Sequence, residues 1–133
     1  MDRVAVVGAA LVRTGVDGVR RVLASRRTEP PHLAGFWEFP GGKVDPGETD
    51  AEALVRELRE ELEVEAAVED RLGADLPIGD TAVLRVYLAR LMSGEPALVD
   101  HDAHRWLAAG ELDQVPWIPV DRPLVDDLRR LLA

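Results

Sequence analysis

Residues 41–64 constrain the fold most, because they join a glycine-rich loop to a helix whose sides differ in character. Thr49 and Glu52 form a T-x-x-E capping box, which predicts that a helix begins at Thr49. At about 100° per residue, the apolar side chains of this helix form one stripe that must pack against another element. The stripe consists of Ala51, Leu54, Val55, Leu58 and Leu62.

The charged residues of this helix fall into two sets. The first set lies opposite the apolar stripe and can pair as i,i+4 neighbours; it consists of Glu52, Arg56, Arg59 and Glu63. The second set, Glu57, Glu60 and Glu61, lies beside the stripe. Glu57 and Glu61 have no cationic residue three or four positions away, and like charges at this spacing destabilise a helix. A solvated, salt-bridged surface therefore explains the first set but not the second.

Carboxylates without a counter-charge on a rigid helix are typical of a site for a hard divalent cation. Mg²⁺ in particular takes oxygen ligands, and the preceding Gly41 and Gly42 add backbone carbonyls that can approach the cluster closely. Metal ions held by carboxylates activate water against phosphorus and neutralise a phosphate chain. The residues therefore predict a metal-binding loop and helix suited to phosphoryl chemistry.

The same segment resembles the signature of the Nudix hydrolases, G-x5-E-x7-R-E-U-x-E-E-x-G-U, in which U is aliphatic. The match covers residues 42–64, with Gly42, Glu48, Arg56, Glu57, Leu58, Glu60, Glu61 and Val64 at the signature positions. One position departs from the signature, because Glu63 stands where the family has a glycine near the helix end. This departure concerns how the helix ends and not the metal chemistry.

The resemblance extends beyond the box. The stretches "LAGFWEFPGGK" and "WIPVDRPLV" look like the approach to the box and the nucleobase-contacting segment of MutT-type Nudix enzymes, which remove pyrophosphate from nucleoside triphosphates. The resemblance therefore implies a small-molecule nucleotide substrate and attack of water on an interior phosphorus, most readily the β one. It also implies one Nudix domain over residues 1–133, with a mixed β-sheet sandwiched between helices in αβα layers.

The resemblance further implies roles for individual residues. The ligands implied for Mg²⁺, or for Mn²⁺ as a substitute, are Glu57, Glu60 and Glu61 with a carbonyl of Gly41 or Gly42. Arg56 would brace the loop through a bidentate contact with Glu48. Asp100, with Asp102 as the fallback, would complete the site as a base or a ligand.

Residues outside the box are candidates for contacts with the nucleotide. Arg27, with Arg26 beside it, would contact the triphosphate. One of Trp37 and Phe39 would stack on the base, while the other packs in the core. Arg85, in an otherwise apolar strand, faces either the pocket or the solvent. A further pair, His101 and His104, lacks a third ligand, so we expect surface positions for both rather than a zinc site.

Asp121 is the residue on which the choice of base depends. Enzymes that remove 8-oxo-guanine nucleotides commonly have Asn at the aligned position, whereas an ionised Asp only accepts hydrogen bonds and suits the amino group of cytosine. We therefore favour (d)CTP or a modified cytosine nucleotide, with 8-oxo-dGTP as the alternative. ADP-ribose or another nucleoside diphosphate derivative is a further alternative. Asp121 is also placed to cap the last helix ahead of Pro123.

Composition limits the remaining classes of protein. A net charge of -9 argues against a surface for long nucleic acid, because such binding depends on excess Lys and Arg. The absence of cysteine excludes disulfides and thiolate chemistry and suits a reducing cytoplasm. The most apolar run, residues 4–12, is too short to span a bilayer and lacks the cationic lead of a signal peptide. The sequence leaves the oligomeric state, including a homodimer, open.

The rest of the chain predicts strands and helices that interleave. We expect a hairpin of strands 4–13 and 19–26, an extended piece 36–40, a loop 41–48, a strand 81–92, a strand running into a short helix over 104–112, and a closing helix 121–133. The closing helix has Pro123 in its first turn and a stripe of Leu124, Leu128, Leu131 and Leu132. This order predicts an α/β or α+β domain with one mixed sheet between helices.

Overall fold

A computed structural model describes residues 3–133. Its centre is a seven-stranded mixed sheet of order β3-β2-β1-β6-β5, in which β4 also pairs with β1 and β7 with β2. The elements are β1 (Val4–Thr14), β2 (Arg20–Arg27), β3 (Trp37–Glu38), β4 (Gly41–Lys43), α1 (Asp50–Leu62), β5 (Glu65–Ile78), β6 (Ala82–Ser93), β7 (His101–Leu107), η1 (Ala109–Gln114) and α2 (Arg122–Leu132).

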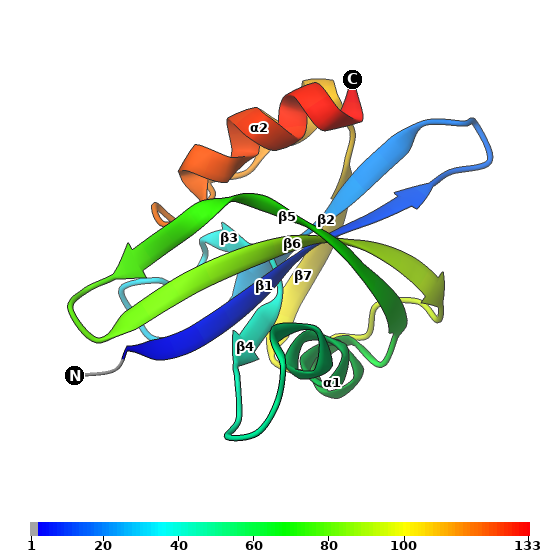
Figure 1. Cartoon of the computed structure of the whole chain (residues 1–133). Coiled ribbons are helices and arrows are strands. Elements are labelled where there is room, and N and C mark those ends of the chain that lie inside the picture. Colours follow the sequence, from blue (N-terminus) through cyan, green and yellow to red (C-terminus); the bar gives the residue numbers. More distant parts are fainter. Residues whose placement is uncertain (1–2) are drawn as a thin grey trace.

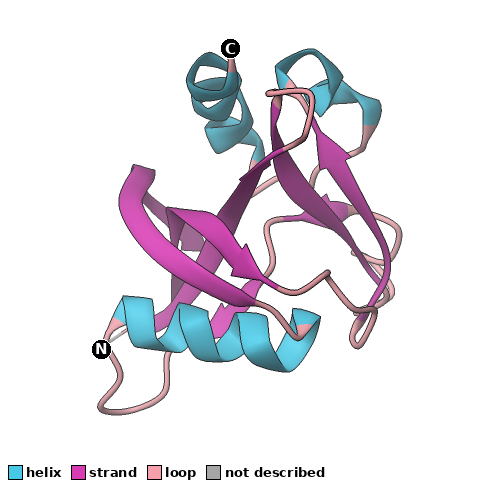
Figure 2. Ribbon diagram, turned by 90° about the vertical axis from the view of Figure 1, so that its right-hand side faces the viewer, coloured by secondary structure: helices cyan, strands magenta, loops and turns pink. Residues whose placement is uncertain are grey.

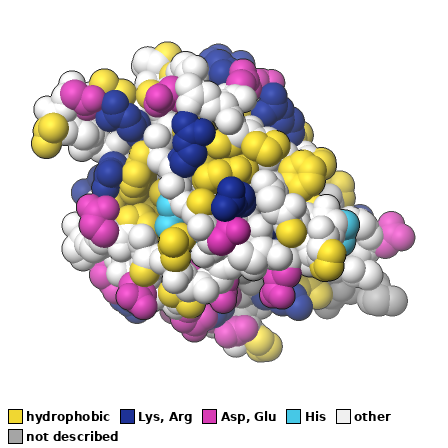
Figure 3. All heavy atoms as spheres, turned by 180° about the vertical axis from the view of Figure 1, so that it is seen from behind, with side chains coloured by type: hydrophobic (Ala, Val, Ile, Leu, Met, Phe, Trp, Pro, Cys, Tyr) yellow, Lys and Arg dark blue, Asp and Glu magenta, His cyan; other side chains and the backbone are white. Residues whose placement is uncertain are grey.

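The sheet separates two helical layers. Helix α1 lies below the sheet and α2 above it in Figure 1, and the side view in Figure 2 shows the same three layers. The predicted mixed sheet between helices is therefore confirmed. Within residues 3–133, neither helix is long and apolar enough to cross a membrane. On the face seen in Figure 3, basic and acidic side chains are interspersed among exposed apolar ones.

Strand β1 lies at the centre of the sheet, and its side chains alternate between two hydrophobic cores. Val7, Ala9 and Leu11 point into the core under α1, whereas Ala10 points into the core under α2. This alternation follows from the two-residue period of a strand, and burial on both faces explains why the run is continuously apolar. The strand pairs in parallel with β6 and antiparallel with β2 and β4.

Residues 41–43 form strand β4, so the prediction of a loop there was wrong. Gly42 pairs with Val7 and Gly41 with Gly8. A Cβ atom at Gly41 would lie 1.9 Å from the carbonyl oxygen of Val7, so only glycine allows the two backbones to approach this closely. The two glycines thus permit pairing with β1 rather than forming a loop.

Strand β5, which is antiparallel to β6, was not predicted from the sequence. The pairing of the two strands shifts register between Val68 and Arg71 and again between Leu72 and Leu76. Most side chains between these positions are exposed and several are charged. Because recognition of a strand depends on regular apolar and polar alternation, these shifts hide the strand from the sequence.

Helix α1 begins where the capping box predicts. The backbone N–H of Glu52 donates to Thr49 Oγ1 at 3.1 Å, and the N–H of Thr49 donates to Glu52 Oε1 at 2.9 Å. The buried side of the helix differs from the predicted stripe, because Ala51 is exposed and Ala53 is buried with Leu54, Leu58 and Leu62. Since Ala53 lies one turn before Glu57, the buried stripe is rotated toward the second set of carboxylates.

Helix α2 has Pro123 in its first turn, as predicted. Its buried side chains are Leu124, Val125, Leu128 and Leu132. Leu131, which was predicted within this stripe, is 43% exposed. Val125 is buried instead, so the side of the helix that packs on the core includes Val125 and excludes Leu131.

Helix α1 ends without the glycine of the Nudix signature. Glu63 is the C-cap and has φ 58° and ψ 39°, in the left-handed region. Its backbone N–H donates to the carbonyl oxygen of Arg59 at 3.1 Å. The left-handed conformation costs a residue with a Cβ about 1–2 kcal/mol. The helix therefore ends in a manner suited to glycine, and Glu63 makes this end less stable.

Replacing Glu63 with glycine should stabilise the protein. We expect Glu63→Gly to raise the free energy of unfolding by about 0.5–1 kcal/mol, because relief of the left-handed strain exceeds the entropy that glycine adds to the unfolded chain. Glu63→Ala is the matched control, since it removes the side chain but keeps the strain. A glycine variant no more stable than the alanine variant in chemical denaturation would contradict this account.

Candidate active site

A cleft with two parts lies beside the C-terminal end of α1, strand β4 and the start of β7. The first part, the acidic cavity, has a volume of about 400 Å³ and is lined by residues that include Arg27, Glu38, Glu61, Asp100 and His101. The second part, the apolar cavity, has a volume of about 280 Å³ and is lined by residues that include Leu33, Phe39, Leu84, Ile118 and Asp121. The cavities share Val6, Arg27, Glu38, Gly41 and Gly42, so they lie next to each other.

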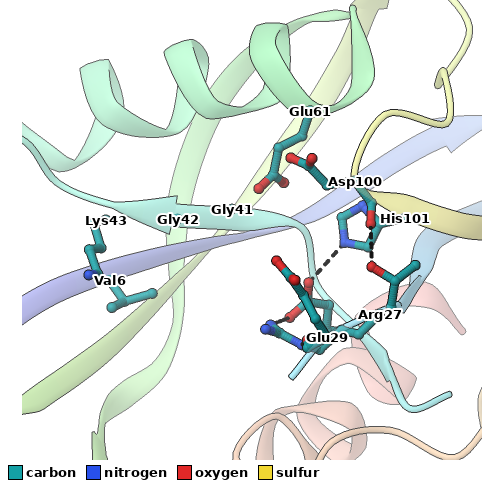
Figure 4. Close-up of a pocket in the computed structure, with 11 residues that line it drawn as sticks. Val6, Arg27, Glu29, Gly41, Gly42, Lys43, Glu61, Asp100 and His101 are labelled. Atoms are coloured by element: carbon teal, nitrogen blue, oxygen red, sulfur yellow. Dashed lines mark hydrogen bonds and ion pairs between the residues drawn. The ribbon is translucent and has the colours of Figure 1, made fainter. Parts of the chain in front are cut away.

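Glu61 projects from the last turn of α1 over Gly41 toward Asp100 (Figure 4). Its Oε2 atom is buried and has no hydrogen-bond partner among residues 3–133. Burial, followed by the charges of Glu57, Glu38 and Asp100, raises the pKa of Glu61 to about 8. The cleft thus contains a carboxyl group that has no counter-charge among the described residues and that a bound cation would help to ionise.

Arg56 links the loop, β4 and the helix. It donates to both carboxylate oxygens of Glu48, from Nε at 2.8 Å and from Nη2 at 2.9 Å. Its Nη1 atom reaches Glu57 at 3.1 Å and Glu60 at 3.2 Å, and Nη2 reaches the carbonyl oxygen of Lys43 at 3.0 Å. Glu57 therefore has a cationic neighbour one residue away, a spacing that the i,i+3 and i,i+4 comparison overlooked.

The two charged sets of α1 are thus less separate than predicted. Arg56 turns toward Glu48, whose two oxygens match its fork, and away from Glu52. Arg59 bonds to Glu65 beyond the helix at 2.5 and 2.9 Å, so its predicted i,i+4 pairing with Glu63 was wrong. The left-handed turn at Glu63 explains this choice, because it redirects the chain and brings Glu65 within reach.

The three box glutamates differ in their surroundings. Glu57 is half-buried, and a Cβ atom at Gly42 would lie 2.5 Å from its carboxylate, so this carboxylate packs directly on the β4 backbone. Burial is the main cause that raises the pKa of Glu57. The side chain of Glu60 is 59% exposed and bonds to Arg56. Glu61 is the box glutamate that lines the acidic cavity.

These residues fit a hard divalent cation. Within the part of the chain that the structure describes, no three acidic or histidine side chains converge closely enough to form a finished metal site. The donor set is nevertheless composed of oxygen, carries excess negative charge and includes the buried, unpartnered Oε2 of Glu61. Glu57 and Glu61, with the carbonyls of Gly41 and Gly42, would hold such an ion, and Asp100 faces Glu61 across the cavity.

Three of the predicted substrate residues line the cleft. Arg27 lies at the junction of the two cavities, where its Nη1 donates to Glu38 Oε1 at 2.7 Å. Phe39 lines the apolar cavity, and its ring lies 4.9 Å from that of Trp117. Asp121 closes the same cavity. Both aromatic residues of the extended piece pack in the core, at 4% exposure for Phe39 and 8% for Trp37, and of the two it is Phe39 that borders the apolar cavity.

The other predicted residues lie outside the cleft. Arg26 bonds to Asp102 at 2.6 Å and lies over the ring of Trp37, which packs in the core. Arg85 donates to both oxygens of Asp50, at 2.6 and 2.8 Å, and Tyr87 donates to the same carboxylate. Arg85 thus faces neither the pocket nor open solvent; it ties the first residue of α1 to β6.

Glu38 was not predicted as a site residue, and two histidines were misplaced. His101 is buried at 6% exposure, and its Nε2 lies 2.9 Å from Glu38 Oε2. His104 is half-buried between Ser25 Oγ at 2.8 Å and the carbonyl oxygen of Ala97 at 2.9 Å. The prediction of surface positions was wrong, because both rings satisfy polar groups in the interior.

The sequence contained one indication that Glu38 is a site residue: it is a charged residue between two large aromatic residues in an extended segment.

Asp121 is 2% exposed, and its side chain points away from α2. Its Oδ2 accepts a hydrogen bond from the backbone N–H of Phe39 at 3.0 Å. It occupies the N-cap position but makes no side-chain capping bond within residues 3–133, so the capping role was wrong. Burial raises the pKa of Asp121 to about 8, with a further contribution from the charge of Glu38. The carboxyl group is therefore mainly neutral at pH 7.

Comparison with known proteins shows what this chain is similar to. A model of the NUDIX domain matches residues 2–128. A putative 8-oxo-dGTP diphosphatase 2 of Mycobacterium tuberculosis is 48% identical over 96% of this chain and 89% of its own length. The CTP pyrophosphohydrolase of Escherichia coli is 33% identical over 100% of this chain and 96% of its own. A crystal structure of a MutT NUDIX hydrolase from Burkholderia pseudomallei superimposes with a TM-score of 0.77, 35% identity and coverage of 95% and 98%.

The raised pKa of Asp121 predicts a pH-dependent stability. Its folded-state pKa of about 8 exceeds the ordinary value of 3.8, so protonation favours the folded state. This contribution is fully present below pH 4 and is lost as the pH rises through 8. Between these values, the free energy of unfolding falls by at most about 1.4 kcal/mol for each pH unit.

Asp121→Asn isolates this effect from the other carboxylates. The variant should gain stability relative to the wild type as the pH rises from 4 to 9, because Asn cannot ionise. Urea unfolding at a series of pH values measures the difference. A difference that stays constant across this range would show that Asp121 does not titrate with a raised pKa.

Proposed function

The chain belongs to the Nudix family and is a hydrolase of phosphorus-containing acid anhydrides, and on this premise we propose that it cleaves nucleoside triphosphates to the monophosphate and pyrophosphate. The assignment to this family from the sequence is confirmed. The observation that carries the proposal is the pair of adjoining cavities, one lined by carboxylates and the other mainly apolar. Such a cleft suits a ligand with a phosphate chain on one side and a base on the other.

The charges of the cleft match the parts of a nucleotide. Arg27 lies at the junction, where the phosphate chain would leave the base. Phe39 and Asp121 line the far cavity, with an aromatic face and one polar group among aliphatic side chains. Pockets for small molecules are commonly built in this way, with an apolar lining and a few polar groups that set orientation.

The acidic cavity would supply the hydrolytic chemistry. Mg²⁺, for which Mn²⁺ could substitute, would neutralise the phosphate chain and lower the pKa of a water molecule when bound. Arg56 holds Glu57 against β4 and so maintains the spacing between α1 and the loop. Asp100, which faces Glu61, would take the proton of the attacking water. A new bond would form between the water oxygen and the β-phosphorus. The bond between that phosphorus and the oxygen that bridges to the α-phosphate would break, and the monophosphate would leave with that oxygen.

The protonation state of Asp121 affects which nucleobase the apolar cavity would bind. The preference for cytosine assumed an ionised Asp121 that only accepts. A neutral carboxyl group offers one donor and one acceptor, as Asn does, and this pair also matches the carbonyl and adjacent N–H of 8-oxo-guanine. The 48% identity to a putative 8-oxo-dGTP diphosphatase supports the same choice. We therefore place 8-oxo-dGTP first among the candidate substrates.

CTP or dCTP is the second candidate. The N3 and amino group of cytosine also present one acceptor beside one donor, which a neutral Asp121 can pair with. The full-length similarity to a CTP pyrophosphohydrolase supports this candidate. The two bases differ in size and in the order of their polar groups, so rates of turnover can distinguish them.

A panel of nucleotides tests the proposal. With Mg²⁺ at pH 7, 8-oxo-dGTP, dGTP, CTP and dCTP should yield pyrophosphate and a monophosphate, with the highest kcat/KM for 8-oxo-dGTP. The highest value for a cytosine nucleotide would select the second candidate. Release of orthophosphate and a diphosphate, or no turnover with any of the four, would contradict the proposal.

The carboxylate of Glu61 should be essential for turnover. We expect Glu61→Gln to lower kcat at least about 100-fold while the protein remains folded, because the change removes a charge but little volume. Glu60→Gln is the matched control on the same helix, and its loss should be smaller because Glu60 lies outside the cavity. Mg²⁺-dependent hydrolysis near the wild-type rate in Glu61→Gln would refute the assigned site.

A further inference from the structure

His101 and Glu38 meet where the two cavities join. The side chain of Glu38 is 13% exposed, and the residue lines both cavities. Its two oxygens have different partners: Oε1 accepts from Arg27 Nη1 at 2.7 Å, and Oε2 lies 2.9 Å from His101 Nε2. One partly buried carboxylate thus connects β2, β3 and β7 where the two cavities meet.

Two of the three guanidinium nitrogens of Arg27 form hydrogen bonds within the protein. Its Nε donates to the carbonyl oxygen of Glu29 at 2.9 Å, and Nη1 donates to Glu38. Among residues 3–133, Nη2 has no hydrogen-bond partner, although Arg27 lines both cavities. The free edge of Arg27 is therefore available to a ligand in the cleft.

The contact between Arg27 and Glu38 uses one carboxylate oxygen. An arginine and a carboxylate commonly form two parallel hydrogen bonds, which satisfy both oxygens and two guanidinium nitrogens. Here His101 occupies the second oxygen of Glu38. Without that contact, Glu38 Oε2 would be a buried acceptor free to take a second bond from Arg27.

His101 makes this contact at a cost to its own hydrogen bonding. Because its Nε2 faces a carboxylate oxygen, which accepts, His101 donates its Nε2 hydrogen to Glu38. Its Nδ1 atom is buried and has no hydrogen-bond partner in the described part of the chain. A buried polar atom without a partner is uncommon and calls for an explanation. A function of the contact between His101 and Glu38 at the cleft would explain why the unpartnered Nδ1 is retained.

We propose that His101 is a positioning residue that keeps Arg27 open to the phosphate chain of the substrate. By donating to Glu38 Oε2, it prevents Arg27 from closing onto both oxygens of Glu38 and leaves Nη2 facing the cleft. This inference rests on the proposed function, because it assigns the free edge of Arg27 to a phosphate oxygen. It concerns binding of the phosphate chain and not the chemical step.

The test compares two substitutions of His101. His101→Leu removes the donor, whereas His101→Gln keeps an N–H donor that can reach Glu38. We expect His101→Leu to raise KM for the best substrate about tenfold, the loss typical of a hydrogen bond to a charged group, with kcat changed less than about threefold. His101→Gln should restore KM to within about threefold of the wild type.

Two controls separate positioning from a loss of stability. In an Arg27→Met background, His101→Leu should raise KM no further, because the residue it positions is gone. Val125→Ala removes buried volume from α2 at a site that lines neither cavity, and it should lower the unfolding midpoint without raising KM. An unchanged KM in His101→Leu, no rescue by Gln, or additive effects of Arg27→Met and His101→Leu would overturn the inference.

Binding of inorganic tripolyphosphate in the presence of Mg²⁺, measured by calorimetry, tests the role of His101 without relying on hydrolysis of a nucleotide. His101→Leu should weaken it about tenfold and His101→Gln less than about threefold. If the wild type hydrolyses none of the nucleotides but this pattern holds, the proposed function fails and the role of His101 stands. If the wild type hydrolyses nucleotides and His101→Leu binds tripolyphosphate normally, the role of His101 fails and the proposed function stands.

Discussion

The close approach of Gly41 to β1 determines where the active site lies. Because glycine has no side chain, β4 pairs directly with β1, and α1 packs over both with its C-terminal turn above the β4 backbone. That arrangement brings the carboxylate of Glu61 to the same cavity as Arg27 from β2 and Asp100 from the connection ahead of β7. A larger residue at position 41 would separate the strands and move the helix away from the cleft.

Charge balance explains how this arrangement serves hydrolysis. Arg56 neutralises Glu48 and reaches Glu57 and Glu60, so it fixes the loop and the outer carboxylates without entering the acidic cavity. Glu61 lies beyond its reach, and burial raises its pKa to about 8. Without a cation the Glu61 carboxyl is therefore mainly protonated at pH 7, and a divalent cation bound beside it would favour its ionised form. At the other end of the cleft, burial raises the pKa of Asp121 to about 8, and this carboxyl group would offer a polar contact to a base.

The sequence predicts the parts of this site that depend on local signals. The capping box at Thr49 and the spacing of the glutamates define α1 and its acidic side, because both follow from neighbours within one or two helical turns. The contacts of Glu38 with His101, of Arg85 with Asp50 and of Asp121 with Phe39 each span tens of residues, so no local pattern in the chain indicates them. Strand β5 was missed for a different reason, since its register shifts interrupt the alternation that identifies a strand.

The central claim is that the uncompensated carboxylate of Glu61 is a cation ligand, and thermal unfolding in a Mg²⁺ titration tests it directly. A ligand that binds only the folded state raises the unfolding midpoint as its concentration exceeds the dissociation constant. Millimolar Mg²⁺ should therefore raise the midpoint of the wild type and leave that of Glu61→Gln almost unchanged. An equal rise in both proteins, or no rise in the wild type, would contradict the account.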